Sequence, residues 1–317
     1  MSVEREKVRF TSGDTECVGW HYRGGNGACV VMAGAFAVPK EPATDLFAQR
    51  FHDAGFSVLA FDYRRLGESG GQPRLVMPVR DQVADWQAAI GYAATLPGVD
   101  PAKVAVWGFS ATAGFLLDVA ARDPRVAAVV AQTPNFGGLA SLRRASSYQK
   151  PGAMLRFLGR GVLDTVGGLL GRPVRLVPLV GEPGTVALLA TPDAIQDGVR
   201  ALNPGNRYPH WRQAVAARSA LGFALYRPGR YAARVRCPLL VLVCDDDRTT
   251  PADLSVRDAD RAPRAEVVRL PGGHYGPFLD GHERAVEAEL SFLRRHLLDP
   301  SKRPAGADDA SALPLQG

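Results

Sequence analysis

The sequence predicts an α/β fold, a doubly wound and mostly parallel β-sheet with helices on both faces and an inserted helical cap. Short runs that are apolar throughout, such as residues 28–33 and 126–131, alternate with longer segments of helical periodicity. Strands that are apolar on both faces are typical of parallel sheets buried between helices. After residue 132 the alternation stops for about a hundred residues, which is too long for a connecting loop and predicts the cap.

The predicted elements follow in order along the chain. Residues 7–10 and 17–22 predict an antiparallel hairpin at one edge of the sheet, because a Thr-Ser-Gly-Asp turn separates them. The apolar runs that predict the other strands are residues 28–33, 56–61, 104–109, 126–131, 238–244 and 265–270. The segments with helical character are residues 41–54, 78–96, 111–122 and 283–298 in the core, and residues 153–158, 161–170 and 209–223 in the cap.

This pattern divides the chain into four parts. Residues 1–132 and 237–298 are the two parts of the core, residues 133–236 are the cap, and residues 299–317 are a tail that we expect to be disordered. The chain has 317 residues, of which 46% are hydrophobic, so a large core can form.

The composition argues against several classes of protein. The net charge is +6, but the Arg residues are scattered and no basic run is interleaved with aromatics, so we expect no nucleic-acid partner. No uncharged apolar run reaches about 18 residues and the first residues are charged, so we expect a soluble, unexported protein with no membrane partner. The cysteines form no Cys-x-x-Cys motif, which predicts reduced, buried thiols in a cytoplasmic protein; they are Cys17, Cys29, Cys237 and Cys244.

The chemistry of the sequence centres on Ser110. It stands between a predicted buried strand and a predicted helix, in the run Gly108-Phe109-Ser110, and a nucleophile elbow needs a Ser flanked by small residues at such a corner. The elbow pattern ends in Gly, whereas this chain has Thr112, so either the corner is wider or the Thr hydroxyl faces the pocket. An ordinary turn with Ser as the helix N-cap is the alternative.

Two later strands are followed by polar residues that suit acyl transfer. Asp245, Asp246 and Asp247 come after one strand and His274 comes after the next. The carboxyl ends of parallel strands share one edge of the sheet, so these groups are expected to meet Ser110 there. A serine hydroxyl needs an imidazole to take its proton, and the imidazole needs a carboxylate to hold its tautomer.

The identity of the carboxylate stays open on the residues alone. Strand geometry would point Asp245 and Asp247 one way and Asp246 the other. Binding of a divalent cation by the three carboxylates is an alternative, but no calcium-loop spacing or His cluster accompanies them, so we expect no metal. For His274 the alternative is a surface turn histidine. The oxyanion of a tetrahedral intermediate needs two N–H donors, which Ala111 and the loop after residues 28–33 are placed to supply.

Taken together, these motifs resemble the α/β-hydrolase superfamily over about residues 7–298. The residues that carry the resemblance are Val31-Met32-Ala33-Gly34-Ala35-Phe36, Phe61-Asp62-Tyr63-Arg64, Gly67-Glu68-Ser69-Gly70-Gly71, Trp107-Gly108-Phe109-Ser110, Asp247 with Pro251, and Gly272-Gly273-His274-Tyr275. The chain is similar to dienelactone hydrolases, X-prolyl-peptidase-like esterases and polyketide-shortening hydrolases. The resemblance implies Ser110 as nucleophile, Asp247 as acid, His274 as base, and the backbone N–H groups of Phe36 and Ala111 as the oxyanion hole.

Two departures from the family pattern lie near the oxyanion. Gly34-Ala35 stands where the family usually has His-Gly, and Thr112 ends the elbow. We therefore expect Gly34, Ala35, Thr112 and Tyr275 among the residues around the pocket. No cofactor is implied.

The leading functional expectation is hydrolysis of an ester or thioester through an acyl-serine intermediate. The substrate is expected to be a medium to large apolar small molecule, polyketide-like or held as a carrier-bound thioester. The alternatives are a lyase that eliminates acetate, a cyclase or an acyltransferase of secondary metabolism with the same triad, and a non-catalytic binding module. A homo-oligomer stays open.

The cap carries apolar and basic side chains that bear on the substrate. The apolar residues suggest an apolar acyl group, although we expect most of them to pack onto the sheet; they are Leu155, Phe157, Leu158, Val162, Leu163, Val166, Leu169 and Leu170. The basic residues are either a solvated face or a site for a carboxylate or for the phosphate of a carrier; they are Arg143, Arg144, Lys150, Arg156 and Arg160.

Overall fold

The computed structural model describes residues 4–137, 143–144 and 146–299, and these residues contain an eight-stranded sheet. Its strand order is β1-β2-β4-β3-β5-β6-β9-β10. The pairs β1–β2 and β2–β4 are antiparallel and the remaining neighbours in this sheet are parallel. The predicted α/β fold with a mostly parallel sheet is confirmed, as is the antiparallel hairpin at its edge.

The strands and helices of the core lie close to the predicted ranges. The strands are β1 (Glu6–Ser12), β2 (Thr15–Tyr22), β3 (Cys29–Ala33), β4 (Ser57–Phe61), β5 (Val104–Phe109), β6 (Val126–Gln132), β9 (Leu239–Cys244) and β10 (Ala265–Leu270). The helices are α1 (Lys40–Asp53), α2 (Val79–Ala93), α3 (Ala111–Arg122), α8 (Ala252–Ala259) and α9 (His282–Leu297), with short 3₁₀ turns η1 (Pro101–Lys103) and η4 (Gly276–Phe278). The sequence analysis does not predict helix α8, because a segment of eight residues is too short to show helical periodicity clearly.

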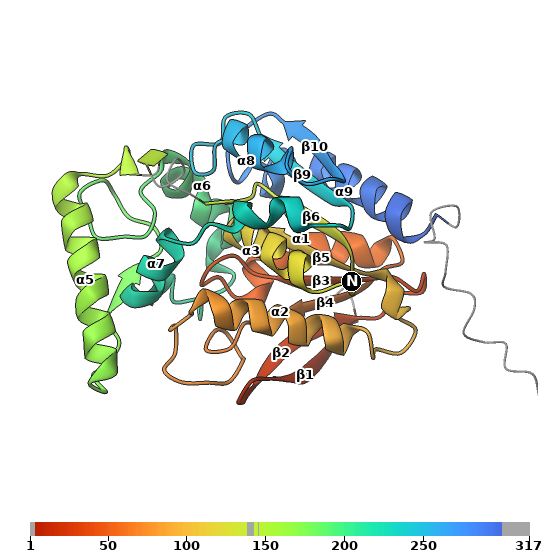
Figure 1. Ribbon diagram of the computed structural model, residues 1–317, viewed down its shortest axis with the longest axis horizontal. Coiled ribbons are helices and arrows are strands. Elements are labelled where there is room, and N and C mark those ends of the chain that lie inside the picture. The colour runs from red at the N-terminus through yellow and green to blue at the C-terminus, as the bar shows by residue number, and fades with distance from the viewer. Residues whose placement is uncertain (1–3, 138–142, 145, 300–317) are drawn as a thin grey trace, which may run out of the picture.

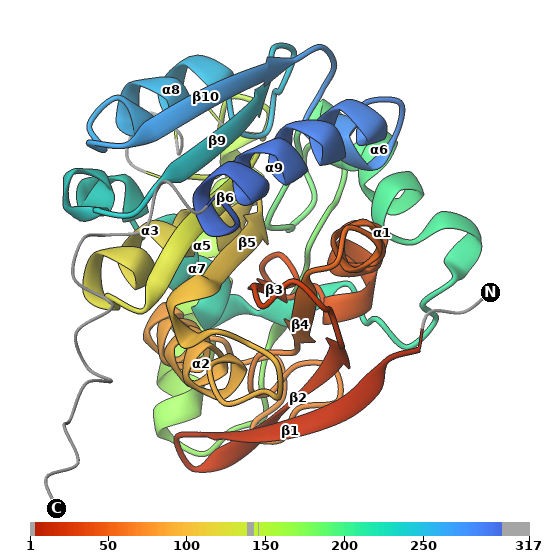
Figure 2. The same ribbon diagram turned by 90° about the vertical axis from the view of Figure 1, so that its right-hand side faces the viewer.

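The core has three layers (Figure 1). Helices α1 and α9 cover one face of the sheet, and α2, α3 and α8 lie on the other face (Figure 2). Every residue of β3, β4, β5 and β9 is buried, as expected for strands with helices on both sides. This arrangement brings the carboxyl ends of β3, β5, β9 and β10 to one edge of the sheet.

The chain leaves the sheet between β6 and β9, and we call residues 133–238 the inserted segment. Its elements are α5 (Pro151–Leu169), β7 (Leu176–Pro178), α6 (Pro192–Leu202), η2 (Pro204–Asn206), β8 (Ala214–Ala216), α7 (Ala217–Ala224) and η3 (Pro228–Arg234). The assignment of this segment as a separate cap stays a prediction.

Several predicted ranges in this segment are wrong. Helix α5 is continuous, whereas the sequence predicts two pieces because of Gly159 and Gly161. Gly161 serves close packing, since a Cβ there would lie 3.1 Å from Leu221 of α7. The predicted helix over residues 209–223 is wrong in its first half, where a turn and irregular residues lead into strand β8, which pairs with β7; α7 covers only residues 217–223 of the range. Each of these strands has three residues, too few to show alternation.

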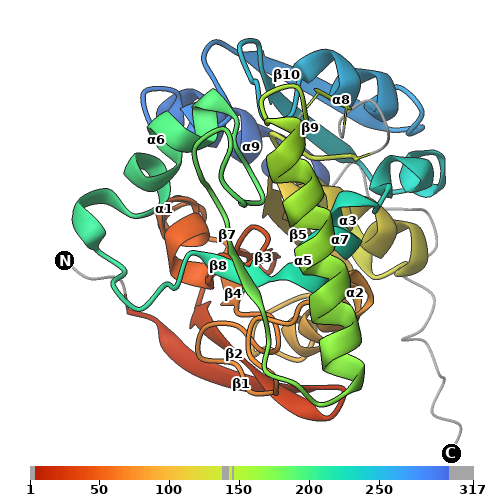
Figure 3. The same ribbon diagram turned by 90° about the vertical axis from the view of Figure 1, so that its left-hand side faces the viewer.

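Most of the apolar residues of α5 do not pack onto the sheet. Helix α5 stands at the outer edge of the molecule with α7 beside it (Figures 1 and 3). Its apolar side chains are largely exposed, with Leu155 at 72% and Leu169 at 83%. The sequence expectation that most of them pack onto the sheet is therefore wrong.

The cysteines and helices bear on two further expectations. All four cysteines are free thiols, of which Cys237 is half-buried and the others are buried. None of the helices in the described part of the chain has the length and hydrophobicity needed to cross a membrane. The tail expected to be disordered lies, except for residue 299, outside the described residues.

A buried carboxyl group connects α9 to β5. Glu289 has no solvent exposure, and one of its carboxyl oxygens accepts a hydrogen bond from Trp107 Nε1 at 3.1 Å. The other oxygen has no partner within the described part of the chain. Burial raises the pKa of Glu289 well above its ordinary value.

This raised pKa makes the stability of the fold depend on pH. Above the unfolded pKa of about 4.3 the unfolded chain gives up the Glu289 proton that the folded chain retains, so stability falls as pH rises toward the folded pKa. We expect Glu289→Gln to raise the free energy of unfolding by about 0.5–2 kcal/mol at pH 8, with the gain shrinking toward pH 5. Urea denaturation across this range measures it. The exposed Glu287→Gln on the same helix is the control, and an equal gain at all pH values would contradict the prediction.

Candidate functional site

Ser110 lies in a sharp turn between the end of β5 and the first residue of α3. Its backbone has φ 56° and ψ −118°, a conformation that non-glycine residues rarely adopt. The Ser110 N–H donates to the carbonyl of Gln132 at 2.9 Å, and its carbonyl accepts from Asn135 N–H at 2.9 Å. A Cβ at Gly108 would lie 2.8 Å from the methyl of Thr112, so the turn requires glycine there. The turn thus has the backbone geometry that a nucleophile elbow requires.

Thr112 connects this elbow to the loop after β3. Its hydroxyl donates to the Gly34 carbonyl at 2.6 Å and lies 3.1 Å from the Tyr63 hydroxyl. Thr112 is fully buried, and among the described residues neither it nor Gly34 lines the cavity beside Ser110. Of the four residues expected around the pocket, the structure thus places Ala35 and Tyr275 in the cavity lining and Gly34 and Thr112 outside it.

The structure brings Ser110, His274 and Asp247 together. The Nε2 atom of His274 lies 2.9 Å from Ser110 Oγ, and its Nδ1 atom lies 2.8 Å from Asp247 Oδ2. His274 and Asp247 are buried, and Ser110 is partly exposed at the cavity. When His274 Nδ1–H donates to Asp247, Nε2 is free to accept the Ser110 hydroxyl proton.

Asp247 is held by more donors than the sequence suggested. Its Oδ1 accepts from the backbone N–H groups of Thr249 at 2.8 Å and Thr250 at 2.6 Å. The Thr250 hydroxyl lies 2.8 Å from Asp247 Oδ2 and 3.0 Å from His274 Nδ1. Asp245, the alternative left open above, instead forms a surface ion pair with Arg269. Sequence reasoning missed Thr250, although a Thr three residues after the last of the strand-end aspartates is a detectable hydrogen-bonding signal.

The two expected oxyanion donors face the same cavity. Phe36 and Ala111 both line it together with Ser110. Neither backbone amide makes a hydrogen bond to any other described residue, so both are available to an incoming oxygen. The ring of Phe223 from α7 stacks on Phe36 with centroids 4.5 Å apart. The inserted segment therefore packs directly on this loop.

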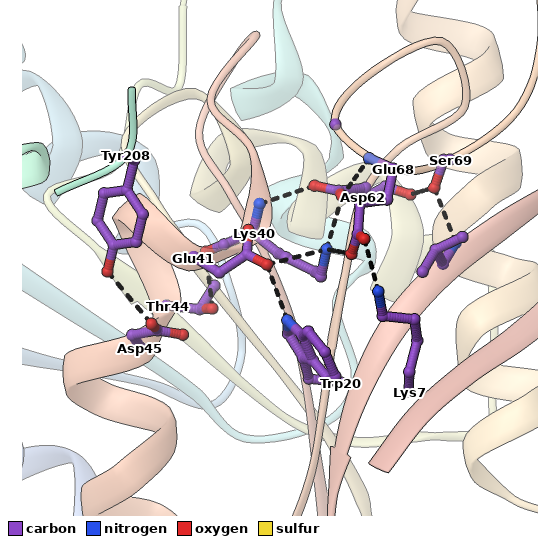
Figure 4. Close-up of polar contacts among 12 residues, drawn as sticks. Lys7, Trp20, Lys40, Glu41, Thr44, Asp45, Asp62, Glu68, Ser69 and Tyr208 are labelled. Carbon is purple, nitrogen blue, oxygen red and sulfur yellow. Dashed lines mark hydrogen bonds and ion pairs between the residues drawn. The ribbon is translucent and has the colours of Figure 1, made fainter. Parts of the chain in front are cut away.

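A buried ion-pair network fixes the other end of the same loop (Figure 4). Lys40 begins α1 and has no exposure; its Nζ lies 2.8 Å from Asp62, 2.9 Å from Glu68 and 3.1 Å from Glu41. The Lys40 backbone N–H also donates to Asp62 at 2.8 Å. Asp62 directly follows β4, so this network joins the start of α1 to the end of the neighbouring strand.

At Lys40 and Glu68, charge pairing outweighs the effect of burial on the pKa. Burial lowers the pKa of Lys40, but the carboxylates of Asp62 and Glu41 outweigh it, so the pKa is raised. Burial likewise raises the pKa of Glu68, but Lys7 and Lys40 outweigh it and lower that pKa to about 2. The lysine and Glu68 therefore stay charged at neutral pH.

The cavity beside Ser110 has a volume of about 150 Å³. Its walls are mostly apolar, and the inserted segment supplies much of them, including Leu179, Leu189, Leu202, Trp211 and Phe223. Among the described residues, none of α5 lines the cavity, so the α5 side chains expected near the acyl group lie elsewhere. The basic side chains of Arg143, Arg144, Lys150, Arg156 and Arg160 are likewise outside its lining.

The chain is similar to known proteins over most of its length. A family model described as the alpha/beta hydrolase family matches residues 24–288, which include Ser110, Asp247 and His274. The chain is 35% identical to the quorum-quenching protein AidA of Acinetobacter baumannii, over 91% of this chain and 94% of that protein. It is 24% identical to a thiohydrolase of Eupenicillium brefeldianum, over 90% of this chain and 92% of that protein.

Two further similarities extend this comparison. The chain is 26% identical to the polyketide transferase af380 of Aspergillus fumigatus, over 93% of this chain and 99% of that protein. Its fold matches the crystal structure of the alpha/beta hydrolase GrgF from Penicillium sp. sh18 with a TM-score of 0.78 and 22% identity, over 93% of this chain and 99% of that one.

The hydrogen bond from Thr112 to Gly34 can be tested through stability. Thr112→Val keeps the shape but leaves the buried Gly34 carbonyl without this donor, so we expect a loss of about 1–3 kcal/mol in the free energy of unfolding. Urea denaturation measures the loss. Thr165→Val is the control, because the Thr165 hydroxyl bonds only a carbonyl of its own helix and faces solvent. Equal unfolding midpoints for Thr112→Val and the wild type would refute the role given to Thr112.

Proposed function

Because the chain belongs to the alpha/beta hydrolase family, we propose that it is a serine hydrolase that cleaves an ester or thioester through an acyl-Ser110 intermediate. The observation that carries the proposal is the position of the His274 ring, with one nitrogen 2.9 Å from Ser110 Oγ and the other 2.8 Å from Asp247. These are hydrogen-bond distances at which a proton can pass from hydroxyl to imidazole.

In the first half of the proposed reaction, Ser110 Oγ attacks the carbonyl carbon while its proton moves to His274 Nε2. The oxygen of the tetrahedral intermediate accepts hydrogen bonds from the N–H groups of Phe36 and Ala111. Asp247 stabilises the imidazolium that forms. When the intermediate collapses, the alcohol or thiol leaves with the proton from His274, and the acyl group stays on Ser110.

In the second half, a water molecule takes the place of the leaving group. His274 removes its proton as it attacks the acyl carbon, and the second intermediate collapses with return of that proton to Ser110 Oγ. The products are the free acid and the regenerated hydroxyl. The same acyl-Ser110 attacked by an alcohol would yield acyl transfer, and the similarity to a polyketide transferase makes this the second candidate.

The cavity supports an apolar acyl group of small to medium size. Its volume of about 150 Å³ is comparable with cavities that hold a benzene-sized ligand, and its walls are mainly apolar. A thioester is included because one similar protein is a thiohydrolase. We propose that the inserted segment acts as the cap that selects the substrate, and that the free thiols reflect a cytoplasmic location.

Isotope labelling tests the reaction. In H₂¹⁸O the wild type is expected to place one ¹⁸O in the acid released from a short-chain p-nitrophenyl ester, and Ser110→Ala to lower kcat by at least about 10⁴-fold. With an alcohol present, unlabelled transfer product would favour the second candidate instead. Release of unlabelled acetate from an acetylated substrate would indicate elimination. Full activity of Ser110→Ala would refute the serine mechanism.

The assignment of the acid is tested by two neighbouring aspartates. We expect Asp247→Asn to lower kcat by about 10⁴-fold, because the amide favours the wrong tautomer of His274. Asp245→Asn is the matched control and should keep activity within about twofold, because it alters only an exposed pair with Arg269, where a surface ion pair contributes little. Steady-state kinetics on one ester compares them, and the reverse pattern would assign the acid to Asp245.

A further inference from the structure

One carboxylate of the inserted segment contacts both loops that carry the acid and the base. Asp193 lies in the first turn of α6 and is buried. Its Oδ2 atom accepts the backbone N–H of Arg248 at 2.8 Å and the backbone N–H of His274 at 3.2 Å. Arg248 directly follows Asp247 in the chain. A single oxygen thus joins the loop after β9 to the loop after β10.

The residues around Asp193 allow its carboxylate to lie close to the backbone of both loops. A Cβ at Gly273 would lie 3.3 Å from Asp193 Oδ2, so glycine leaves room for the carboxylate beside the backbone. The hydroxyl of Thr191, which precedes α6, lies 2.7 Å from the hydroxyl of Thr249. Helix α6 therefore has two polar connections to the loop that begins after β9.

The same helix also forms part of the cavity wall. Gly198, Val199 and Leu202 line the cavity, and a Cβ at Gly198 would lie 3.4 Å from the Tyr275 hydroxyl oxygen. The residues of α6 that meet the acyl group and the residue that holds the two loops are thus on one short rigid element.

From these contacts we propose that Asp193 is a positioning residue that sets the distance between Asp247 and His274. The inference rests on the proposed hydrolase function. Hydrogen bonds from backbone N–H groups to a carboxylate are strengthened by its charge, so the two bonds to Asp193 resist separation of the two loops. Without Asp193, the two loops keep the hydrogen bond from the Asp246 N–H to the Gly272 carbonyl at 3.0 Å but lose the bridge between the backbones of Arg248 and His274.

Substitution of Asp193 tests this role. We expect Asp193→Ala to lower kcat for a short p-nitrophenyl ester by up to about 100-fold, with KM nearly unchanged, because a small displacement of the base weakens proton transfer more than binding. The rate of Ser110 labelling by a fluorophosphonate should fall by a similar factor. Asp193→Asn keeps an oxygen acceptor and should recover much of the loss. Asp197→Ala is the control on the same helix, where the half-buried Asp197 forms an ion pair with the exposed Arg200 and contacts neither loop backbone.

Hydrogen exchange gives a readout that does not depend on activity. In Asp193→Ala the backbone amides of Arg248 and His274 are expected to exchange faster than in the wild type, while amides of β5 keep their rates. Unchanged exchange at both amides, or a wild-type kcat in Asp193→Ala, would overturn the proposal. If Asp193→Ala does not fold, Asp193→Asn carries the test through its smaller loss of kcat and faster exchange. A wild type that reacts with neither ester nor fluorophosphonate would refute the proposed function. The exchange rates would still show whether Asp193 holds the backbone amides of Arg248 and His274.

Discussion

The strained backbone at Ser110 is the constraint on which the site depends. A non-glycine residue in that conformation costs about 1–3 kcal/mol and persists only where its surroundings hold it. Here β6 holds it through the Gln132 carbonyl, the loop after β6 holds it through Asn135, and Thr112 anchors the following turn to the Gly34 carbonyl. The elbow is therefore stable because three neighbouring segments share its hydrogen bonds.

The groups around Ser110 are held in place by a buried ion pair on one side and by backbone hydrogen bonds to a carboxylate on the other. On one side, the Lys40–Asp62 pair fastens the start of α1 to the end of β4, which limits the movement of the loop that contains Phe36. On the other side, the backbone N–H groups of Thr249 and Thr250 hold one carboxylate oxygen of Asp247, and its other oxygen contacts His274. Both arrangements fix the positions of polar groups in the absence of substrate. Such preorganisation is the condition for electrostatic stabilisation of a developing charge.

The sequence predicted the parts of the fold that have a strong local signal. Runs such as residues 29–33 are apolar throughout, which is the sequence pattern of a parallel strand buried on both faces. The order of Ser110, Asp247 and His274 along the chain and their places after strands were also visible. The sequence alone did not distinguish Asp245 from Asp247. That distinction depends on which carboxylate accepts the Thr250 backbone N–H across a turn.

Contacts between distant segments explain the remaining differences. Asp193 precedes its two amide partners by 55 and 81 positions, and nothing in its neighbours indicates them. The apolar stripe of α5 predicted burial, because periodicity identifies a face and says nothing about what covers it. Thr112 was expected near the pocket because the usual residue at that place is Gly, but its hydroxyl donates a hydrogen bond to the buried Gly34 carbonyl.

Within the inserted segment, the helices differ in how they reach the site. Helix α5 contacts α7 through Asp164, whose carboxylate accepts from the Arg218 backbone and side chain, and through the close approach at Gly161. Helix α7 then places Phe223 against Phe36, the loop residue beside Ser110. Helix α5 thus reaches the site through α7 and places no residue in the described cavity lining, whereas α6 and α7 themselves contribute to the cavity wall. The described cavity wall therefore combines side chains of α6 and α7 with Leu179, Leu189 and Trp211 from other parts of the inserted segment, and it includes none from the exposed apolar face of α5.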